Sequence, residues 1–332
     1  MKRIAFALLL LSALPALAQP GAAPYLGRWA LDLPGGGAGW LEITDQGGWL
    51  DGSLLWGGGS VNPLASVYLN KNGLIATQTA TVERKDAAGV VVRTQTFTDM
   101  LRITVEGDTL KGARMNPKRD GSGVDRKEFT GKRIPALPPA PDLSKVRFGK
   151  EITLFNGKDL EGWKLTGPSK NGWFAKDGVL CNDPKQEEGR PHLNYGNLRT
   201  EREFEDFKLC LEVNVPKDGN SGIYLRGIYE VQVQDNFGKP LDSHNMGGIY
   251  SRIAPSASAE KPAGEWQTYE ITLVDRHVTV VLNGVTVIDN QPLAGCTGGA
   301  LWADEFKPGP IYLQGDHTGV MYRNIRLSPV EK

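Results

Sequence analysis

Cysteine is scarce in this sequence, neither sign of charge is in excess, and long hydrophobic runs are missing after the first 18 residues. Three cysteines in 332 residues exclude a disulfide-stapled scaffold, and none of them has the C-x-x-C spacing of a zinc finger. The 38 basic residues are matched by 38 acidic ones, which argues against nucleic acid because a phosphate binder needs a local surplus of cations. We therefore expect no nucleic acid partner, no nucleotide cofactor and, once the N-terminus is removed, no transmembrane segment.

Glycine, in contrast, is abundant. Its 41 residues make up about 12% of the chain, against an average of about 7%. This excess favours turns between short strands over long helices. At roughly 100–200 residues per domain the length allows two domains, and the 40% of apolar residues is enough for a core in each.

The first 18 residues have the features of a secretory signal peptide. Lys2-Arg3 is a basic start, residues 5–14 are apolar but too few to span a bilayer, and a small-residue cleavage motif ends at Ala18. Removal of this segment leaves 36 basic and 38 acidic residues, so the mature chain stays close to neutral. We expect the protein to be periplasmic or secreted.

Residues 19–133 predict a small all-β domain. Alternating apolar and polar runs recur there between turn residues without a helical period, which is typical of an antiparallel sandwich or barrel. The expected strands are 40–44, 49–57, 65–70, 74–84, 90–98, 101–107 and 110–114. The proline-rich residues 134–147 predict an extended, semi-rigid linker.

Residues 148–332 predict a second β domain with longer strands. The expected strands are 207–215, 221–227, 229–235, 266–275, 277–284, 285–290, 309–315 and 321–330. Asn283-Gly284 between two of them is a strong signal for a type I′ hairpin turn. The pattern predicts an all-β protein in which a large antiparallel sandwich follows the smaller β domain.

Alternation along three of these strands puts polar side chains on one face. Successive side chains of a strand point to opposite sides of the sheet, so those between the apolar positions share the side away from the core. They are Tyr224, Arg226, Glu230, Gln232, Gln234, Tyr312 and Gln314, with His317 just beyond. An ordinary solvated face is the alternative, but such faces are usually rich in Lys, Thr and Ser. Planar, hydrogen-bonding and aromatic groups are typical of a sugar-binding groove.

The second domain also resembles a known family. The motifs ITLFNGKDLEGWK (152–164), GNSGIYLRGIYEVQVQD (219–235), PAGEWQTYEITLVDRHVTVVLNG (262–284) and GPIYLQGDHTGVMYRNIRL (309–327) are similar to those of the 3-keto-disaccharide hydrolase domain, and they occur in the same order. The resemblance covers nearly all of residues 148–330. It implies a concanavalin-like jelly-roll sandwich that cleaves glycosides whose sugar has been oxidised to a ketone at C3.

The implied chemistry needs a small set of groups. A C3 ketone acidifies the proton at C2, so a general base can remove it, and the enediolate then expels the substituent at C1. Addition of water completes a net hydrolysis. Such a site requires a base that works near pH 7, a group that stabilises the enolate oxygen, and donors that orient the ring. A divalent metal would serve as the enolate stabiliser.

We take Glu230, His317 and Asp235 as the candidate catalytic residues, and the same three as candidate ligands of a divalent metal of unspecified identity. The expected substrate-binding residues are Tyr224, Arg226, Gln232, Gln314 and His244. His244 lies in a loop that could close over the sugar. We assign no role to His192, or to His277, which opens a strand of a structural hairpin.

Two alternatives use the same fold and face. A carbohydrate-binding module without catalysis would need only the polar groups. A conventional glycoside hydrolase would need two carboxylates about 5–9.5 Å apart across the scissile bond. Glu230 and Asp235 fit that description less well, because they lie at different depths along one strand.

Overall fold

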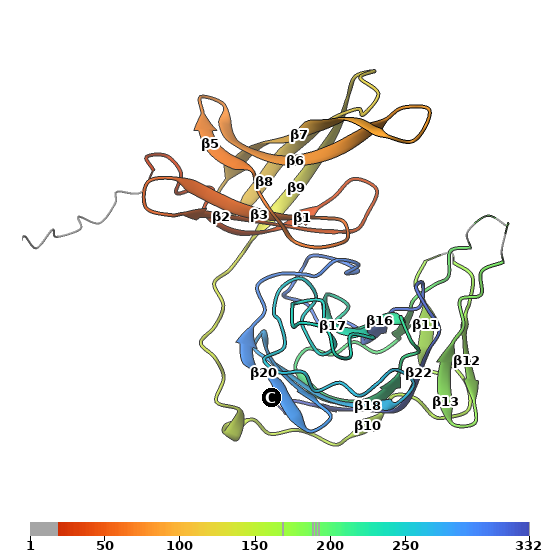
Figure 1. The fold of residues 1–332 in the computed structure, drawn as a ribbon. Helices are drawn as coiled ribbons and strands as arrows, with labels where there is room; N and C mark the ends of the chain where they lie inside the picture. Colours follow the sequence, from red (N-terminus) through yellow and green to blue (C-terminus); the bar gives the residue numbers. More distant parts are fainter. Residues whose placement is uncertain (1–18, 168, 188, 190, 192, 332) are drawn as a thin grey trace, which may run out of the picture.

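The computed structural model describes residues 19–167, 169–187, 189, 191 and 193–331. The predicted all-β fold class is confirmed, because two β units follow each other along the chain and the 3-10 turn η1 (Leu143–Lys145) is the one helical element of the described residues (Figure 1). No helix in this part of the chain has the length and apolarity needed to cross a bilayer. The predicted signal peptide, residues 1–18, lies outside the described residues.

The first unit is a closed antiparallel barrel. Its order is β2-β1-β9-β8-β7-β6-β5-β3, and pairing of β3 with β2 closes the ring, while the short β4 pairs with β3. The strands are β1 (Gly27–Asp32), β2 (Ala38–Asp45), β3 (Leu50–Trp56), β4 (Asn62–Pro63), β5 (Ser66–Asn70), β6 (Gly73–Lys85), β7 (Val91–Glu106), β8 (Thr109–Pro117) and β9 (Val124–Ile134). Trp29, Leu41, Leu54 and Leu101 fill its interior.

Strands β1, β4 and β9 are not among the expected strands, and two of the differences from the sequence prediction have a clear physical reason. The expected strands 90–98 and 101–107 are one strand, β7, whose backbone stays paired with β6 through Asp99 and Met100. Strand β9 was not predicted, because its first five residues (VDRKE) are all exposed and show no alternation. Pairing on both sides, with β1 and β8, holds β9 in the sheet despite this composition.

The second unit is a sandwich of two antiparallel sheets. The larger sheet has the order β12-β13-β22-β15-β18-β19-β20 with β10 beside β22, and the smaller has the order β11-β14-β21-β16-β17. The strands are β10 (Ile152–Thr153), β11 (Trp163–Leu165), β12 (Trp173–Lys176), β13 (Val179–Asn182), β14 (Leu198–Thr200), β15 (Phe207–Asn214), β16 (Asn220–Leu225), β17 (Tyr229–Gln234), β18 (Trp266–Val274), β19 (His277–Leu282), β20 (Val285–Pro292), β21 (Tyr312–Leu313) and β22 (Val320–Pro329). This is the predicted jelly-roll type of sandwich.

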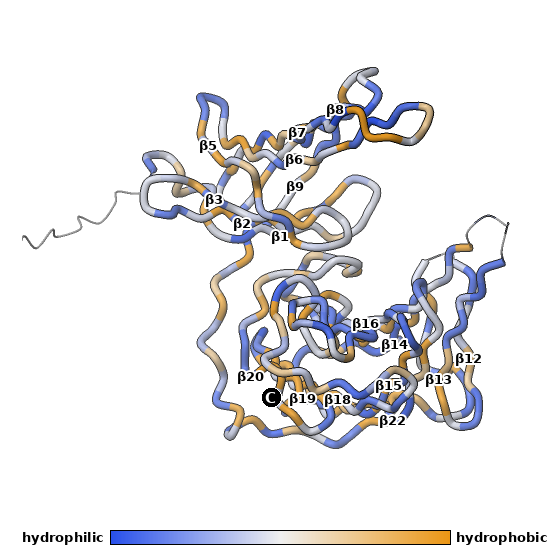
Figure 2. Tube along the Cα trace, viewed as in Figure 1, coloured by the Kyte–Doolittle hydropathy of each residue, from blue (hydrophilic) through white to orange (hydrophobic). Residues whose placement is uncertain are grey.

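The two sheets differ in how they are buried. Strands β15, β18 and β22 alternate between buried and more exposed residues, so one face of the larger sheet packs on the core and the other meets solvent. In Figure 2 the tube in this region carries both hydrophobic and hydrophilic residues. In β16 and β17 nearly every residue is buried. These two strands of the smaller sheet are therefore covered on both faces, by the core on one side and by loops on the other.

Local signals in the sandwich are confirmed. Asn283 and Gly284, with φ angles of 50° and 82°, make the predicted turn between β19 and β20. All three cysteines are free.

The linker between the units lies against the hairpin of β19 and β20. Arg276 donates to the carbonyl of Ala136 at 2.9 Å, and Asn290 donates to the carbonyl of Pro141 at 3.0 Å.

The barrel core generates a stability prediction. Trp29 is completely buried, and its indole N–H donates to the carbonyl of Tyr25 at 3.0 Å. We expect Trp29→Ala to lower the free energy of unfolding by about 3–5 kcal/mol, because a large cavity opens in the barrel. Trp49, which is 58% exposed, is the control: Trp49→Ala should change stability by less than about 0.5 kcal/mol. Urea unfolding of both variants measures the difference, and equal losses would contradict the assignment of Trp29 to the core.

Candidate functional site

A cavity of about 240 Å³ lies on the outer side of the smaller sheet, over β16 and β17. Its lining residues come from these strands, from the loop after β21, from the loop between β17 and β18, and from two loops that each contribute a pair of glycines. They are Gly58, Gly59, Asn220, Tyr224, Glu230, Gln232, Tyr250, Gly298, Gly299, Gln314, Asp316 and His317. The cavity is smaller than the roughly 300–1,000 Å³ typical of sites for drug-sized ligands, and so suits a small ligand such as one sugar ring.

Strand pairing and glycine together place Glu230 in this cavity. Tyr224 of β16 stands directly opposite Glu230 of β17, so the two side chains lie on one face. Gly222 stands opposite Gln232, and a Cβ atom on Gly222 would lie only 2.3 Å from Glu230 Oε1. The missing side chain of Gly222 therefore makes the space that the carboxyl group occupies.

The Tyr224 hydroxyl is shared between two oxygen atoms. It lies 2.6 Å from the carbonyl oxygen of Gly298 and 2.8 Å from Glu230 Oε2. A hydroxyl carries one proton, and a backbone carbonyl can only accept. The proton that Tyr224 offers to Glu230 is therefore shared with Gly298, which weakens a hydrogen bond that would otherwise favour the charged carboxylate.

Burial acts against this hydrogen bond and outweighs it. Glu230 is 3% exposed, and loss of solvation raises the pKa of its carboxyl from 4.5 to about 8. The hydrogen bond with Tyr224 lowers this pKa, and the negative charge of Asp316 raises it. At neutral pH most of the Glu230 population is therefore protonated and able to donate a proton into the cavity.

Asp316 and His317 form a second titratable pair. His317 Nδ1 lies 2.8 Å from Asp316 Oδ1, and both side chains are partly exposed. This hydrogen bond raises the pKa of His317 above its usual 6.5. Burial raises the pKa of Asp316, but His317 outweighs this and holds it below 3.8. Because Nδ1 is occupied, Nε2 is the ring nitrogen left to exchange a proton with a ligand.

Two glutamines add unpaired oxygen atoms to the cavity. Gln232 donates to Gln234 Oε1 at 3.0 Å, while its own Oε1 is buried without a partner. Gln314 Oε1 is also buried and unpartnered. A buried acceptor without a donor costs free energy, so these atoms suit a ligand rich in hydroxyl groups.

The structure brings together five of the eight predicted site residues. Glu230, His317, Tyr224, Gln232 and Gln314 all line the cavity. Tyr224, however, is completely buried. Its hydroxyl contacts Glu230, and its aromatic ring is not available to stack on a sugar.

The other three predicted residues do not line the cavity. Arg226 has a φ of 55°, which turns the chain at the end of β16, and its guanidinium donates to the carbonyls of Glu305 and Lys307 at 2.6 Å each. Asp235 accepts from the amide of Asp218 at 2.9 Å, beyond the end of β17. His244 lies next to the cavity, where Nε2 is 3.0 Å from Ser60 Oγ of the barrel and its ring packs edge-on against Tyr250.

Sequence reasoning missed several lining residues. Asp316 precedes His317 directly, and that adjacency was a usable signal for an Asp–His pair. Tyr250 and Asn220 lie in a loop and at a strand start, where alternation gives no direction. Gly58 and Gly59 come from the barrel, far away in the sequence, and no local pattern indicates their place.

The side chains around the cavity do not form a complete ligand set for the expected divalent metal. Among the described residues no group of three or more His, Cys, Asp or Glu side chains is placed to hold a metal ion. Glu230 favours its neutral form, whereas a metal ligand must be deprotonated. Asp235 lies outside the cavity lining. Of the histidines without an assigned role, His277 is buried with Nδ1 2.9 Å from the carbonyl of Asp275, and His192 lies outside the described residues.

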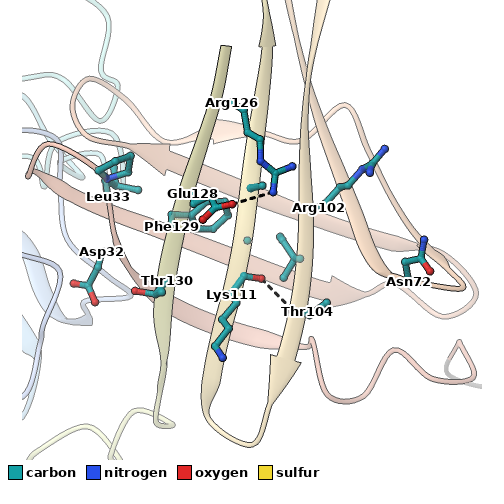
Figure 3. Close-up of a pocket in the computed structure, with 14 residues that line it drawn as sticks. Asp32, Leu33, Asn72, Arg102, Thr104, Lys111, Arg126, Glu128, Phe129 and Thr130 are labelled. Carbon is teal, nitrogen blue, oxygen red and sulfur yellow. Dashed lines mark hydrogen bonds and ion pairs between the residues drawn. The ribbon is translucent and has the colours of Figure 1, made fainter. Parts of the chain in front are cut away.

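A larger hollow, of about 620 Å³, lies on the barrel (Figure 3). Arg126 and Glu128, two residues apart on β9, form an ion pair of 3.0 Å in its lining, and their side chains are 57% and 76% exposed. Phe129 lies buried beside them. Exposed charges of this kind interact weakly because water screens them. The charged side chains that line this hollow are all exposed, so it holds no buried titratable group comparable to Glu230.

The raised pKa of Glu230 generates a prediction about stability. In the folded state its carboxyl keeps a proton up to about pH 8. In the unfolded state the carboxyl has its ordinary pKa of 4.5 and loses the proton above that pH. The folded protein should therefore lose up to about 5 kcal/mol of stability as the pH rises through this window.

Glu230→Gln should remove this component, because an amide does not titrate. Urea unfolding at pH 5, 7 and 9 measures it, with Glu128→Gln on the barrel surface as the control. The same pH dependence in wild type and Glu230→Gln would contradict the assignment of a neutral Glu230.

With this geometry in view, comparisons with known proteins identify the family. Residues 150–328 match the 3-keto-alpha-glucoside-1,2-lyase-like domain. A 3-keto-disaccharide hydrolase of Bacteroides thetaiotaomicron is 28% identical over 235 residues, covering 54% of this chain and 78% of that protein. Two crystal structures of proposed glycosyl hydrolases from Parabacteroides distasonis also align. One is 30% identical with a TM-score of 0.44 and covers 59% of this chain and 93% of its own. The other is 21% identical with a TM-score of 0.42, and the alignment covers 55% of this chain and 94% of the other protein's chain. Since the matched segment is more than half of the chain, the protein belongs to the 3-keto-alpha-glucoside-1,2-lyase-like domain family of enzymes, which confirms the resemblance of its sequence motifs.

Proposed function

We propose that the protein cleaves glycosides whose sugar carries a ketone at C3, by removal of the C2 proton, elimination of the C1 substituent and addition of water. The observation that carries this proposal is the pairing, in one sugar-sized cavity, of a buried proton donor with a separate base. Glu230 is the donor, and the His317–Asp316 pair supplies the base. The names of the family and of the relative from Bacteroides thetaiotaomicron support the choice of substrate.

The first step uses the neutral form of His317. Nε2 removes the proton from C2, the C–H electron pair forms a C2–C3 double bond, and negative charge moves to the oxygen on C3. We assign the amide N–H₂ of Gln314, which lines the cavity, as the donor to this oxygen, and its unpartnered Oε1 as an acceptor for a sugar hydroxyl. Asp316 then stabilises the imidazolium through its 2.8 Å contact with Nδ1.

The second step uses the proton of Glu230. The enediolate expels the glycosidic oxygen from C1, Glu230 donates its proton to that oxygen, and an enone with a C1–C2 double bond remains. Glu230 is then ionised inside a buried site, which makes it a strong base for a carboxylate. It removes a proton from water, the hydroxide adds to C1, and His317 returns its proton to C2. The sum is hydrolysis.

A conventional glycosidase mechanism is supported less well. It needs two carboxyl groups facing each other across the scissile bond. Asp235 does not line the cavity, and Asp316 is engaged by His317. We also propose that the protein works in the periplasm or outside the cell, on the basis of the signal-peptide features of residues 1–18.

Activity of a matched pair of variants tests the role of Glu230. Glu305 is also buried, also has a raised pKa, and accepts a hydrogen bond from Tyr229 at 2.6 Å, but it does not line the cavity. We expect Glu230→Gln to lower kcat on a 3-keto-glucoside by about 100-fold or more, as for loss of a general acid. Glu305→Gln should stay within a few-fold of wild type. The kcat of each variant is measured from the rate at which the free leaving group appears, which chromatography detects.

The same assay separates the alternatives. Rapid cleavage of the unoxidised glycoside would favour a conventional glycosidase, and sugar binding without any cleavage would favour a binding module. Dialysis against a chelator tests the metal: we expect little loss of rate, because the ligand set is incomplete. A loss that Mn²⁺, Zn²⁺ or Ca²⁺ restores would show that a metal takes part.

The two pKa shifts also predict a bell-shaped dependence of kcat/KM on pH. The rate should rise as His317 loses its proton at a pH above 6.5 and fall as Glu230 ionises near pH 8. Asp316→Asn should move both limbs to lower pH, because Asp316 raises the pKa of both groups. Limbs that stay in place in this variant would contradict the assignment.

A further inference from the structure

We propose that a loop of the N-terminal barrel, residues 57–61 between β3 and β4, forms the wall of the active site that meets the leaving group of the glycoside. The barrel would then help to determine which glycosides are cleaved. This inference rests on the proposed function, and it assigns a role to a part of the chain outside the matched family segment, residues 150–328.

The first observation is the composition of the cavity. Gly58 and Gly59 of this loop line it together with Glu230 and His317. The two glycines precede Glu230 by more than 170 residues and belong to a different sheet. The cavity is therefore built from both units of the fold.

The second observation is a close approach of two backbones. A Cβ atom on Gly298 would lie 2.1 Å from the carbonyl oxygen of Gly59 and 2.7 Å from its amide nitrogen. Gly298 is the residue whose carbonyl accepts the Tyr224 hydroxyl, and Tyr224 contacts Glu230. The barrel loop thus packs directly on the segment that positions the proton donor. The oxygen that receives this proton carries the leaving group, which therefore emerges on the side of the loop.

The third observation is that the loop is held firmly. Ser60 Oγ lies 3.0 Å from His244 Nε2, and the amide of Val61 donates to Ser251 Oγ at 2.8 Å. Nearby, the guanidinium of Arg252 lies 4.3 Å from the ring of Trp40. The role of His244 is therefore to hold the barrel loop beside the cavity through its contact with Ser60.

Packing beneath these polar contacts is continuous. Ala38, Trp40, Leu55 and Ile134 of the barrel belong to the same buried cluster as the core of the sandwich. A Cβ atom on Gly295 would lie 2.2 Å from the indole nitrogen of Trp40, so the ring of Trp40 packs directly on the backbone of the sandwich at this glycine. A shared core of this kind fixes the wall in position, in contrast to a domain on a flexible tether.

The loop offers a position for a direct test. Gly58 has no positive φ, and no atom lies within 4 Å of a Cβ built on it, so a side chain fits there without backbone strain. Gly58→Phe would fill space beside the leaving group. Ala88→Phe, on the exposed turn between β6 and β7, is the matched control because it adds the same ring to the barrel away from the cavity.

The substrates are two 3-keto-glucosides, one with methyl and one with a second glucose as the leaving group. We expect Gly58→Phe to lower kcat/KM for the larger substrate by about tenfold or more, the scale of a steric change in a specificity pocket. The methyl glycoside should lose less activity than the larger substrate, so that the ratio of the two kcat/KM values changes, and Ala88→Phe should leave this ratio unchanged. Equal activity of Gly58→Phe and wild type on both substrates would overturn the role of the loop.

A second variant keeps the test valid if Gly58→Phe does not fold. Gly58→Cys adds only a thiol, which a small methanethiosulfonate or a bulky maleimide can modify after folding. The bulky reagent should suppress cleavage of the larger substrate selectively, and the small reagent should not. Wild type treated in the same way controls for Cys181 and Cys210, which are partly exposed. Full activity after bulky modification would overturn the proposal. Wild type that cleaves neither substrate would instead overturn the proposed function and this inference with it.

Discussion

Removal of one carboxyl group from water is the constraint on which the site depends. A carboxylate exposed on a β-sheet keeps a pKa near 4 and holds no proton at neutral pH. Glu230 reaches a pKa of about 8 because nothing but protein surrounds it, apart from the small cavity. Gly222 leaves room for the group, and the carbonyl of Gly298 accepts a hydrogen bond from Tyr224. A Cβ atom at Gly222 would collide with the carboxyl group, and one at Gly298 would collide with the backbone of Gly59.

Burial on this scale also explains why the smaller sheet departs from the usual pattern. An antiparallel sheet commonly leaves one face in water. Strands β16 and β17 have nearly all residues buried, because loops from the sandwich and the barrel cover their outer face. The shared hydrophobic cluster that joins barrel and sandwich stabilises this cover. Solvent exclusion at Glu230 is thus a property of the whole chain.

Sequence patterns predicted the parts of the fold and site that depend on local rules. Alternation located the strands and put Tyr224, Glu230 and Gln232 on one face, as the pairing of β16 with β17 confirms. The same rule failed at Arg226, where a φ of 55° ends the strand and points the side chain elsewhere. The burial of the polar face was not predictable, because it depends on contacts between residues such as Gly59 and Gly298 that are distant in sequence.

A second tyrosine–glutamate pair shows what distinguishes a reactive carboxyl from a structural one. Glu305 and Tyr229 are as deeply buried as Glu230 and Tyr224, and burial again raises the pKa of the carboxyl. Around Glu305, however, the charges of Arg276 and Arg252 act to lower that pKa. Near Glu230 the neighbouring charge is Asp316, which raises it, and a cavity gives a ligand access. Desolvation alone therefore makes a carboxyl neutral, whereas the neighbouring charge and the open space beside it make its proton available for transfer.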